Sequence, residues 1–169
     1  MNRAWKAQIN ASAPLPQKFF SSPLSRAAST LQLTWSDIVI KNAPFLKPMF
    51  LENLRESIGL HTCDKRRDKT YLHRTFPDFN FEKAFSPIDE LWTPDLQETP
   101  EQQTLRIRKA LNWIWETEPA ATYVSITAHS GTLSAILENI GHRKFKVQTG
   151  GMIPAVVKAA EKAYLSRCD

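Results

Sequence analysis

Two short segments of the sequence combine residue types that suit the binding of an anion. Arg26 comes soon after the apolar run Lys18-Phe19-Phe20, and His129-Ser130-Gly131 directly follows the apolar run from Tyr123 to Ala128. An arginine offers a two-pronged donor to a phosphate, and a histidine can donate to a phosphoryl oxygen. The candidate binding residues are therefore Arg26, His129, Ser130 and Gly131.

Both segments lie where the sequence predicts a strand to end and a helix to begin. Before Arg26, Ser22 is a favourable N-cap residue and Pro23 suits the first helical position. The free N–H groups at the start of a helix attract anions, and ligands of parallel sheets bind beyond the carboxyl ends of the strands. Two such junctions, one with an arginine and one with a histidine, predict a phosphate pocket. The apolar face of the first helix consists of Leu24, Ala27, Ala28 and Leu31.

The residues alone also leave simpler interpretations open. Arg26 could face solvent from its helix, and His129 could be a hydrogen-bonded structural histidine at the end of a strand. Ser130-Gly131 could form an ordinary turn. Glu52 and Glu56 could form ion pairs with Arg55 on a helix surface.

Further helices are predicted from apolar periodicity and from capping residues. The clearest start is Thr99-Pro100-Glu101-Gln102, which combines an N-cap threonine, a proline at the first helical position and the glutamine of a capping box. Ile107, Leu111 and Ile114 give that helix its buried stripe. The other predicted helices lie around Trp5 and Ile9, from Pro44 to Gly59, and after His129 up to Gly141.

The remaining segments complete a pattern of alternating strands and helices. Residues 60–98 show no clean periodicity and are predicted to form a long insertion, or lid, over a sheet edge. Residues 145–147 and 153–157 are predicted to pair as a hairpin around Gly150-Gly151, with Pro154 at an edge or bulge. Together these segments predict an α/β fold with a mostly parallel sheet, and 169 residues suit a single domain.

Composition and charge limit the classes of function. The net charge of +5 suits an anionic partner. The basic run from Lys65 to Arg74 is interrupted by Asp68, and its simplest interpretation is a solvated loop. No aromatic stacking platform accompanies it, so we expect no nucleic-acid binding. No apolar run is long enough to span a membrane, and the two cysteines favour a cytoplasmic location, with access to the nucleus left open.

Several motifs resemble those of one enzyme family and occur in that family's order. Ser22-Pro23-Leu24-Ser25-Arg26-Ala27, followed by Thr30, is similar to the S-P-L-x-R-A-x-x-T segment of histidine phosphatases. The run from Tyr123 to Gly131 resembles the strand that ends in the family's second histidine. Leu54-Arg55-Glu56 resembles the segment that carries its general acid. Similarity to phosphoglycerate-mutase-like proteins of fungal type also covers residues 59–66, 89–92 and 150–154.

The resemblance implies a three-layer αβα fold and a role for each candidate residue. Glu56 would protonate the leaving oxygen of a small phosphorylated molecule. Glu52 competes with Glu56 for this role, because Gly59 follows Glu56 one residue sooner than in many relatives. The resemblance implies no metal ion and no other cofactor. The residues implied to bind and stabilise the phosphoryl group are Arg26, His129, Ser130 and Gly131.

One motif of the family is missing from the sequence. The family's nucleophile is a histidine in an Arg-His-Gly motif that precedes the segment similar to Ser22–Thr30, whereas here no histidine precedes His61. Cys63 is no substitute, because position 69 is lysine where a cysteine-phosphatase loop needs arginine, and His61, Cys63 and His73 lack a fourth zinc ligand. We therefore expect residues 1–169 to form one domain that lacks the first strand. Such a domain would be incomplete at its N-terminus and inactive alone, and it would self-associate through exposed sheet surface.

Three hypotheses of function follow. The first is a phosphomonoesterase or mutase lineage, seen here as an incomplete chain. The second is a pseudophosphatase that binds a phosphorylated ligand or partner through Arg26 and His129 without turnover. The third is a scaffold whose basic stretch from Lys65 to Arg74 binds an acidic partner or nucleic acid. None of the three involves a membrane or a cofactor.

Overall fold

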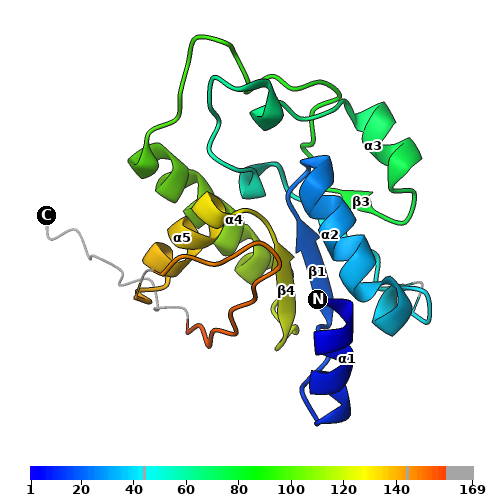
Figure 1. Cartoon of the computed structure of the whole chain (residues 1–169). Coiled ribbons are helices and arrows are strands. Elements are labelled where there is room, and N and C mark those ends of the chain that lie inside the picture. Colours follow the sequence, from blue (N-terminus) through cyan, green and yellow to red (C-terminus); the bar gives the residue numbers. More distant parts are fainter. Residues whose placement is uncertain (44, 144, 159–169) are drawn as a thin grey trace, which may run out of the picture.

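Four parallel strands form the sheet at the centre of the molecule. A computed structural model describes residues 1–43, 45–143 and 145–158, and Figure 1 shows helices on both sides of these strands. The strand order is β3-β2-β1-β4, so β1 lies between β2 and β4. Because all pairings are parallel, the carboxyl ends of the strands share one edge. The strands are β1 (Lys18–Ser21), β2 (Met49–Phe50), β3 (Asn80–Phe81) and β4 (Val124–Thr127).

Helices connect the strands, as parallel pairing requires. A turn of π-helix (Ser36–Ile40) extends α2, and short 3₁₀ turns occur at Glu52–Leu54 and Thr62–Asp64. Two of the longer helices, α4 and α5, pack against each other. The α-helices are α1 (Asn2–Asn10), α2 (Ser25–Trp35), α3 (Lys69–Thr75), α4 (Pro100–Thr117) and α5 (Ser130–Asn139).

The central strands β1 and β2 are buried and have helices on both sides (Figure 1), which makes the fold a three-layer α/β structure as predicted. Phe19 and Phe20 are neighbours in β1 and point to opposite faces, since side chains alternate along a strand. Phe19 joins a cluster with Trp35 of α2 and Leu72 of α3. Phe20 joins a second cluster that includes Ile114 of α4.

Several predicted elements are confirmed. The strands β1 and β4 lie where the apolar runs placed them. In α4, the Thr99 hydroxyl accepts from the Gln102 backbone N–H and the Gln102 side chain accepts from the Thr99 N–H, so the capping box is present. The face of α2 predicted to be apolar is buried at Ala27, Ala28 and Leu31.

The helix predicted from Pro44 to Gly59 is wrong. Over the described part of this segment the chain forms β2 and a single 3₁₀ turn. Pro48 cannot donate a helical hydrogen bond. The run Met49-Phe50-Leu51 that follows is short and continuously apolar, which suits a strand buried on both faces, and Phe50 and Leu51 are indeed buried.

Three other predictions need correction. Helix α2 begins at Ser25, with Leu24 rather than Ser22 in the capping position, and the Ser22 hydroxyl accepts from the Leu24 N–H at 3.3 Å. The hairpin of residues 145–147 and 153–157 is wrong, because neither segment is a strand. Residues 60–98 contain α3 and the strand β3, which is more regular structure than their lack of periodicity predicted.

The outer strand β4 exposes part of its apolar surface. Tyr123, just before the strand, is 49% exposed, and Val124 is 41% exposed. Self-association through this surface stays a prediction. Among the described residues, no helix is both long and apolar enough to cross a membrane.

Candidate phosphoryl-binding site

The two predicted junctions meet at the carboxyl ends of β1 and β4. Ser21 pairs with Thr127 at the end of the ladder, and the Ser22 N–H donates to the Thr127 carbonyl at 3.0 Å. This pairing brings Ser22, which precedes α2, beside His129, which precedes α5. His129 Nε2 lies 2.8 Å from the Ser22 hydroxyl oxygen.

Arg26 and His129 contact each other directly, although 103 residues separate them in the sequence. Arg26 Nε donates to His129 Nδ1 at 3.3 Å. An Nδ1 that accepts carries no proton, so the neutral ring holds its proton on Nε2 and donates it to Ser22. The contact between Arg26 and His129 therefore fixes the tautomer of the histidine.

The Arg26 guanidinium has further partners that the sequence did not predict. Its Nη1 donates to the Cys63 carbonyl at 2.6 Å, and its Nη2 lies 3.9 Å from Asp64 Oδ1. Both residues belong to the 60–98 segment, and no local pattern in the sequence relates them to α2. The Arg26 side chain is still 47% exposed, so it remains open to solvent.

The electrostatics of the site keep His129 neutral. Burial and the nearby Arg26 guanidinium lower the pKa of His129 from 6.5 to about 4. The Glu56 carboxylate opposes this change and Arg106 reinforces it. At neutral pH the imidazole is therefore a hydrogen-bond donor and acceptor without charge.

This low pKa predicts that stability falls as the pH decreases from about 6.5 to about 4. The unfolded chain regains the ordinary pKa of 6.5 and binds more protons in this window, so acid favours unfolding, by up to about 3 kcal/mol. Urea unfolding at pH 7.5, 5.5 and 4.0 measures the effect. His129→Gln is the control, because it removes this titration, and parallel pH profiles of the two proteins would contradict the prediction.

The Glu56 carboxylate contacts the first turn of α5. Its Oε2 accepts from the Gly131 N–H at 3.3 Å, and its Oε1 accepts from the Ser57 N–H at 3.1 Å. A third donor is Gln103 Nε2 of α4, 3.4 Å from Oε1. A Cβ on Gly131 would collide with Glu56 Oε1, so glycine is needed here for close approach of the carboxylate.

Glu52, the alternative acid, lies elsewhere. Its carboxylate accepts from Arg55 Nη1 at 3.0 Å and from Arg66 Nε at 2.7 Å. The two arginines neutralise Glu52 and hold it within a buried cluster. The structure thus brings Glu56, and not Glu52, to the start of α5.

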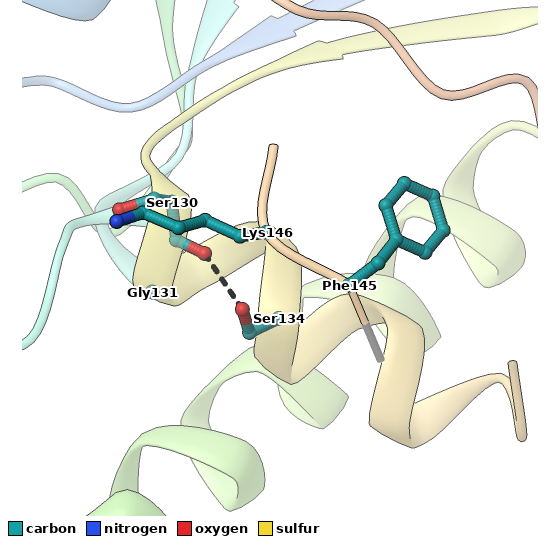
Figure 2. Close-up of a pocket in the computed structure, with 5 residues that line it drawn as sticks. All are labelled: Ser130, Gly131, Ser134, Phe145 and Lys146. Atoms are coloured by element: carbon teal, nitrogen blue, oxygen red, sulfur yellow. Dashed lines mark hydrogen bonds between the residues drawn. The ribbon is translucent and has the colours of Figure 1, made fainter. Parts of the chain in front are cut away.

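Ser130 and Gly131 line an open hollow of about 370 Å³. In Figure 2 the Lys146 side chain reaches across the first turn of α5 toward Ser130, while the Phe145 ring points away from it. Lys146 adds a positive charge that the sequence analysis missed, because nothing in the sequence placed residue 146 against α5. A smaller hollow of about 130 Å³ lies beside Glu56 and Asp64.

The basic stretch from Lys65 to Arg74 is mostly exposed to solvent, as predicted, but from Lys69 it is the helix α3 rather than a loop. Arg66 is 3% exposed and bound to Glu52. Lys65 lies over the Trp92 ring and Lys69 over the Phe81 ring. Only Arg66 among these basic side chains forms an ion pair within the described part of the chain. Within the described part of the chain, no three His, Cys, Asp or Glu side chains are grouped to hold a metal ion.

Comparison with known proteins agrees with the motifs. The model of the histidine phosphatase superfamily (branch 1) matches residues 3–149. The chain is 37% identical over 155 residues to "Probable phosphoglycerate mutase" of Arthroderma benhamiae, covering 91% of this chain and 46% of that protein. It is 37% identical over 144 residues to "Phosphomutase-like protein 3" of Candida albicans, covering 85% and 44%.

A third similar protein is "Probable phosphoglycerate mutase PMU1" of Saccharomyces cerevisiae, which is 29% identical over 164 residues. The match covers 85% of this chain and 55% of the yeast protein. The chain thus spans about half the length of the curated relatives it matches.

Proposed function

Because this chain belongs to the histidine phosphatase superfamily (branch 1), we propose that its site binds the phosphoryl group of a small phosphomonoester. The observation that carries the proposal is the contact of Arg26 with His129 at the carboxyl ends of two adjacent parallel strands. Ligands of α/β sheets bind at this edge. The Ser25 hydroxyl, in the same turn as Arg26, is buried and has no hydrogen-bond partner among the described residues.

Each side chain has a distinct task in this proposal. Arg26 neutralises the phosphoryl charge through the exposed part of its fork. His129 donates from Nε2 once a phosphoryl oxygen takes the place of the Ser22 hydroxyl. The free N–H groups at the start of α5 add positive potential. Where a nucleophile takes the phosphoryl group, Glu56 in its protonated form would deliver a proton to the leaving oxygen, so that the organic group departs as a neutral alcohol.

Transfer or hydrolysis also needs a nucleophile. The histidine that the family resemblance implies would precede the Ser22–Arg26 segment, and no histidine of the 169 residues precedes His61. A second candidate function is the binding of a phosphorylated ligand without turnover, for which the contact of Arg26 with His129 is sufficient. We propose phosphoryl binding as the function of these residues, and turnover as a function that needs a nucleophile as well.

Arg26→Ala is expected to weaken phosphate binding by about 10- to 100-fold, because a hydrogen bond to a charged group contributes about 1.5–3 kcal/mol. Isothermal titration of the folded chain with inorganic phosphate, and with vanadate, measures the affinity. Arg108→Ala is the matched control, since Arg108 is exposed on α4 and donates to Asn139 Oδ1 at 2.9 Å, away from Arg26 and His129. Equal affinity of the Arg26 variant and the native chain would reject the proposal.

The same samples decide between the two candidate functions. Incubation with p-nitrophenyl phosphate is expected to release no phenolate above the blank if the chain only binds. Release that disappears in both His129→Gln and Glu56→Gln would instead support turnover by the chain itself.

A further inference from the structure

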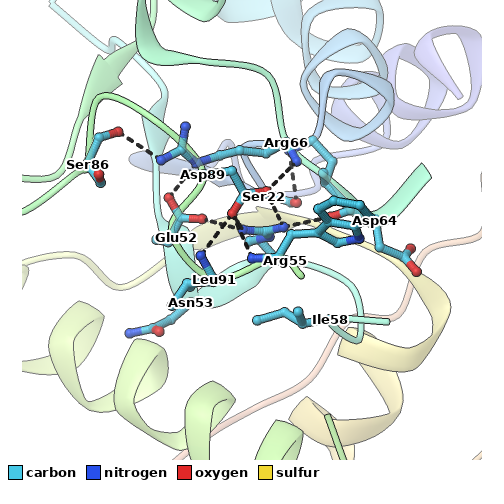
Figure 3. Close-up of polar contacts among 12 residues, drawn as sticks. Ser22, Glu52, Asn53, Arg55, Ile58, Asp64, Arg66, Ser86, Asp89 and Leu91 are labelled. Carbon is cyan, nitrogen blue, oxygen red and sulfur yellow. Dashed lines mark hydrogen bonds and ion pairs between the residues drawn. The ribbon is translucent and has the colours of Figure 1, made fainter. Parts of the chain in front are cut away.

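Arg55 and Asp89 form a buried pair of charged side chains (Figure 3). The Arg55 side chain is fully buried, and the Asp89 side chain is 2% exposed. Arg55 Nη1 donates to Asp89 Oδ1 at 2.6 Å, and Nη2 donates to Asp89 Oδ2 at 2.8 Å. Such a two-pronged contact fixes the orientation of both groups.

The Arg55–Asp89 pair holds the backbone on both sides of Lys65. Arg55 Nη2 also donates to the Asp64 carbonyl at 2.6 Å, and Asp89 Oδ2 accepts from the Arg66 N–H at 2.8 Å. Burial alone would raise the pKa of Asp89, but the hydrogen bonds from Arg55, Arg66 and Trp92 hold it below its ordinary value. Asp89 is therefore charged at neutral pH. In this form it accepts the hydrogen bonds that hold the 64–66 backbone.

The anchored segment in turn holds Arg26. The Cys63 carbonyl accepts from Arg26 Nη1 at 2.6 Å, and the Asp64 carboxylate lies 3.9 Å from Nη2. Gly59 leaves room for this carboxylate, because a Cβ at that position would lie 2.8 Å from Asp64 Oδ2. The direction of the Arg26 fork thus depends on where the 63–66 backbone is held.

We propose that Arg55 and Asp89 are positioning residues for the anion site. They hold residues 63–66 so that the Cys63 carbonyl and the Asp64 carboxylate keep the Arg26 guanidinium against His129. The inference rests on the proposed function, because the direction of Arg26 concerns a ligand only if Arg26 binds one. Neither residue touches the ligand.

The first measurement needs no ligand and follows the His129 ring by NMR as the pH is varied. Asp89→Asn removes a negative charge, which by direct electrostatics would lower the pKa of His129 further. If Arg26 is released from His129, the pKa instead rises above its value of about 4. The sign of the change therefore separates a positioning effect from a through-space effect. We expect a rise of about 1 pH unit or more.

The second measurement is phosphate affinity by calorimetry. Asp89→Asn is expected to weaken binding about tenfold, since small misplacements of a binding group are costly. Glu118→Gln is the matched control, because it breaks a partly buried ion pair with Lys18 at 2.8 Å that lies outside the site. The control is expected to leave both the His129 pKa and the phosphate affinity unchanged.

Arg55→Lys carries the test if Asp89→Asn does not fold. Lysine keeps the positive charge but cannot form the two-pronged contact. We therefore again expect a higher pKa of His129 and weaker phosphate binding. A folded variant with an unchanged or lower His129 pKa would overturn the positioning role. If the native chain binds no phosphate, the proposed function fails, while the His129 titration still decides whether Arg55 and Asp89 position Arg26.

Discussion

Replacement of Phe50 by alanine is expected to lower the free energy of unfolding by about 3–5 kcal/mol. Phe50 is fully buried in β2. Its ring lies 4.9 Å from Phe79 and 5.2 Å from Phe81, measured between centroids. Alanine would leave a cavity between β2, β3 and the segment that follows α3, and rigid neighbouring rings cannot close it.

Denaturant unfolding of three variants measures this effect. Phe50→Leu keeps most of the volume and is expected to cost under about 2 kcal/mol. Phe45→Ala is the matched control, because Phe45 is 82% exposed and surface changes are usually within about 0.5 kcal/mol. Similar losses for Phe45→Ala and Phe50→Ala would show that the two-residue strand β2 is not part of the core.

Replacement of Arg106 by leucine is expected to cost about 3–5 kcal/mol as well, for an electrostatic reason. Arg106 Nε and Nη2 donate to the two oxygens of Glu98 at 2.7 and 2.6 Å. The Glu98 side chain is only 9% exposed, so its charge would remain buried with the Ile58 N–H, at 3.1 Å, in place of an ion-pair partner. Arg106 also donates to backbone carbonyls of the segment that leads to Glu56, at Asn53, Arg55 and Glu56.

A comparison of variants separates the contribution of the Glu98 ion pair from that of the backbone carbonyl contacts. Arg108→Leu, two residues along the same helix, is expected to change stability by less than about 0.5 kcal/mol, because Arg108 is exposed. The double variant Glu98→Leu with Arg106→Leu removes the buried charge, but the carbonyls of Asn53 and Glu56 lose the Arg106 donor and the Ile58 N–H loses the Glu98 acceptor. It is expected to recover only part of the loss. Full recovery would mean that the carbonyl contacts of Arg106 contribute nothing.

Sequence patterns predicted the elements whose signals are local. The capping box at Thr99 and the apolar run before His129 each lie within a few residues, so α4 and β4 were placed correctly. The strand β2 was mistaken for part of a helix, because a two-residue strand has too few positions to show a period of two. Only its pairing with β1 and β3 makes it a strand.

The candidate site likewise contains some residues that sequence patterns predict and some contacts that they do not. Arg26 and His129 were predicted to meet because each follows a strand of a parallel sheet, and the structure brings them together. Glu56 could not be separated from Glu52, because both precede Gly59 on an apparent helix. The contacts of Glu52 with Arg55 and Arg66 depend on tertiary structure, as does the contact of Arg26 with Cys63. Such contacts between distant segments leave no local signature.

The long sequence separation within the site has a consequence for the order of folding. Ser22 and His129 are 107 residues apart, and Arg26 and His129 are 103 apart. Closing loops of this length costs conformational entropy that only later packing can offset. The local helices and the neighbouring pair α4 and α5 can form first, whereas β1 and β4 must find each other across well over half of the chain. The ability to bind an anion should therefore be among the last properties that a refolding molecule regains.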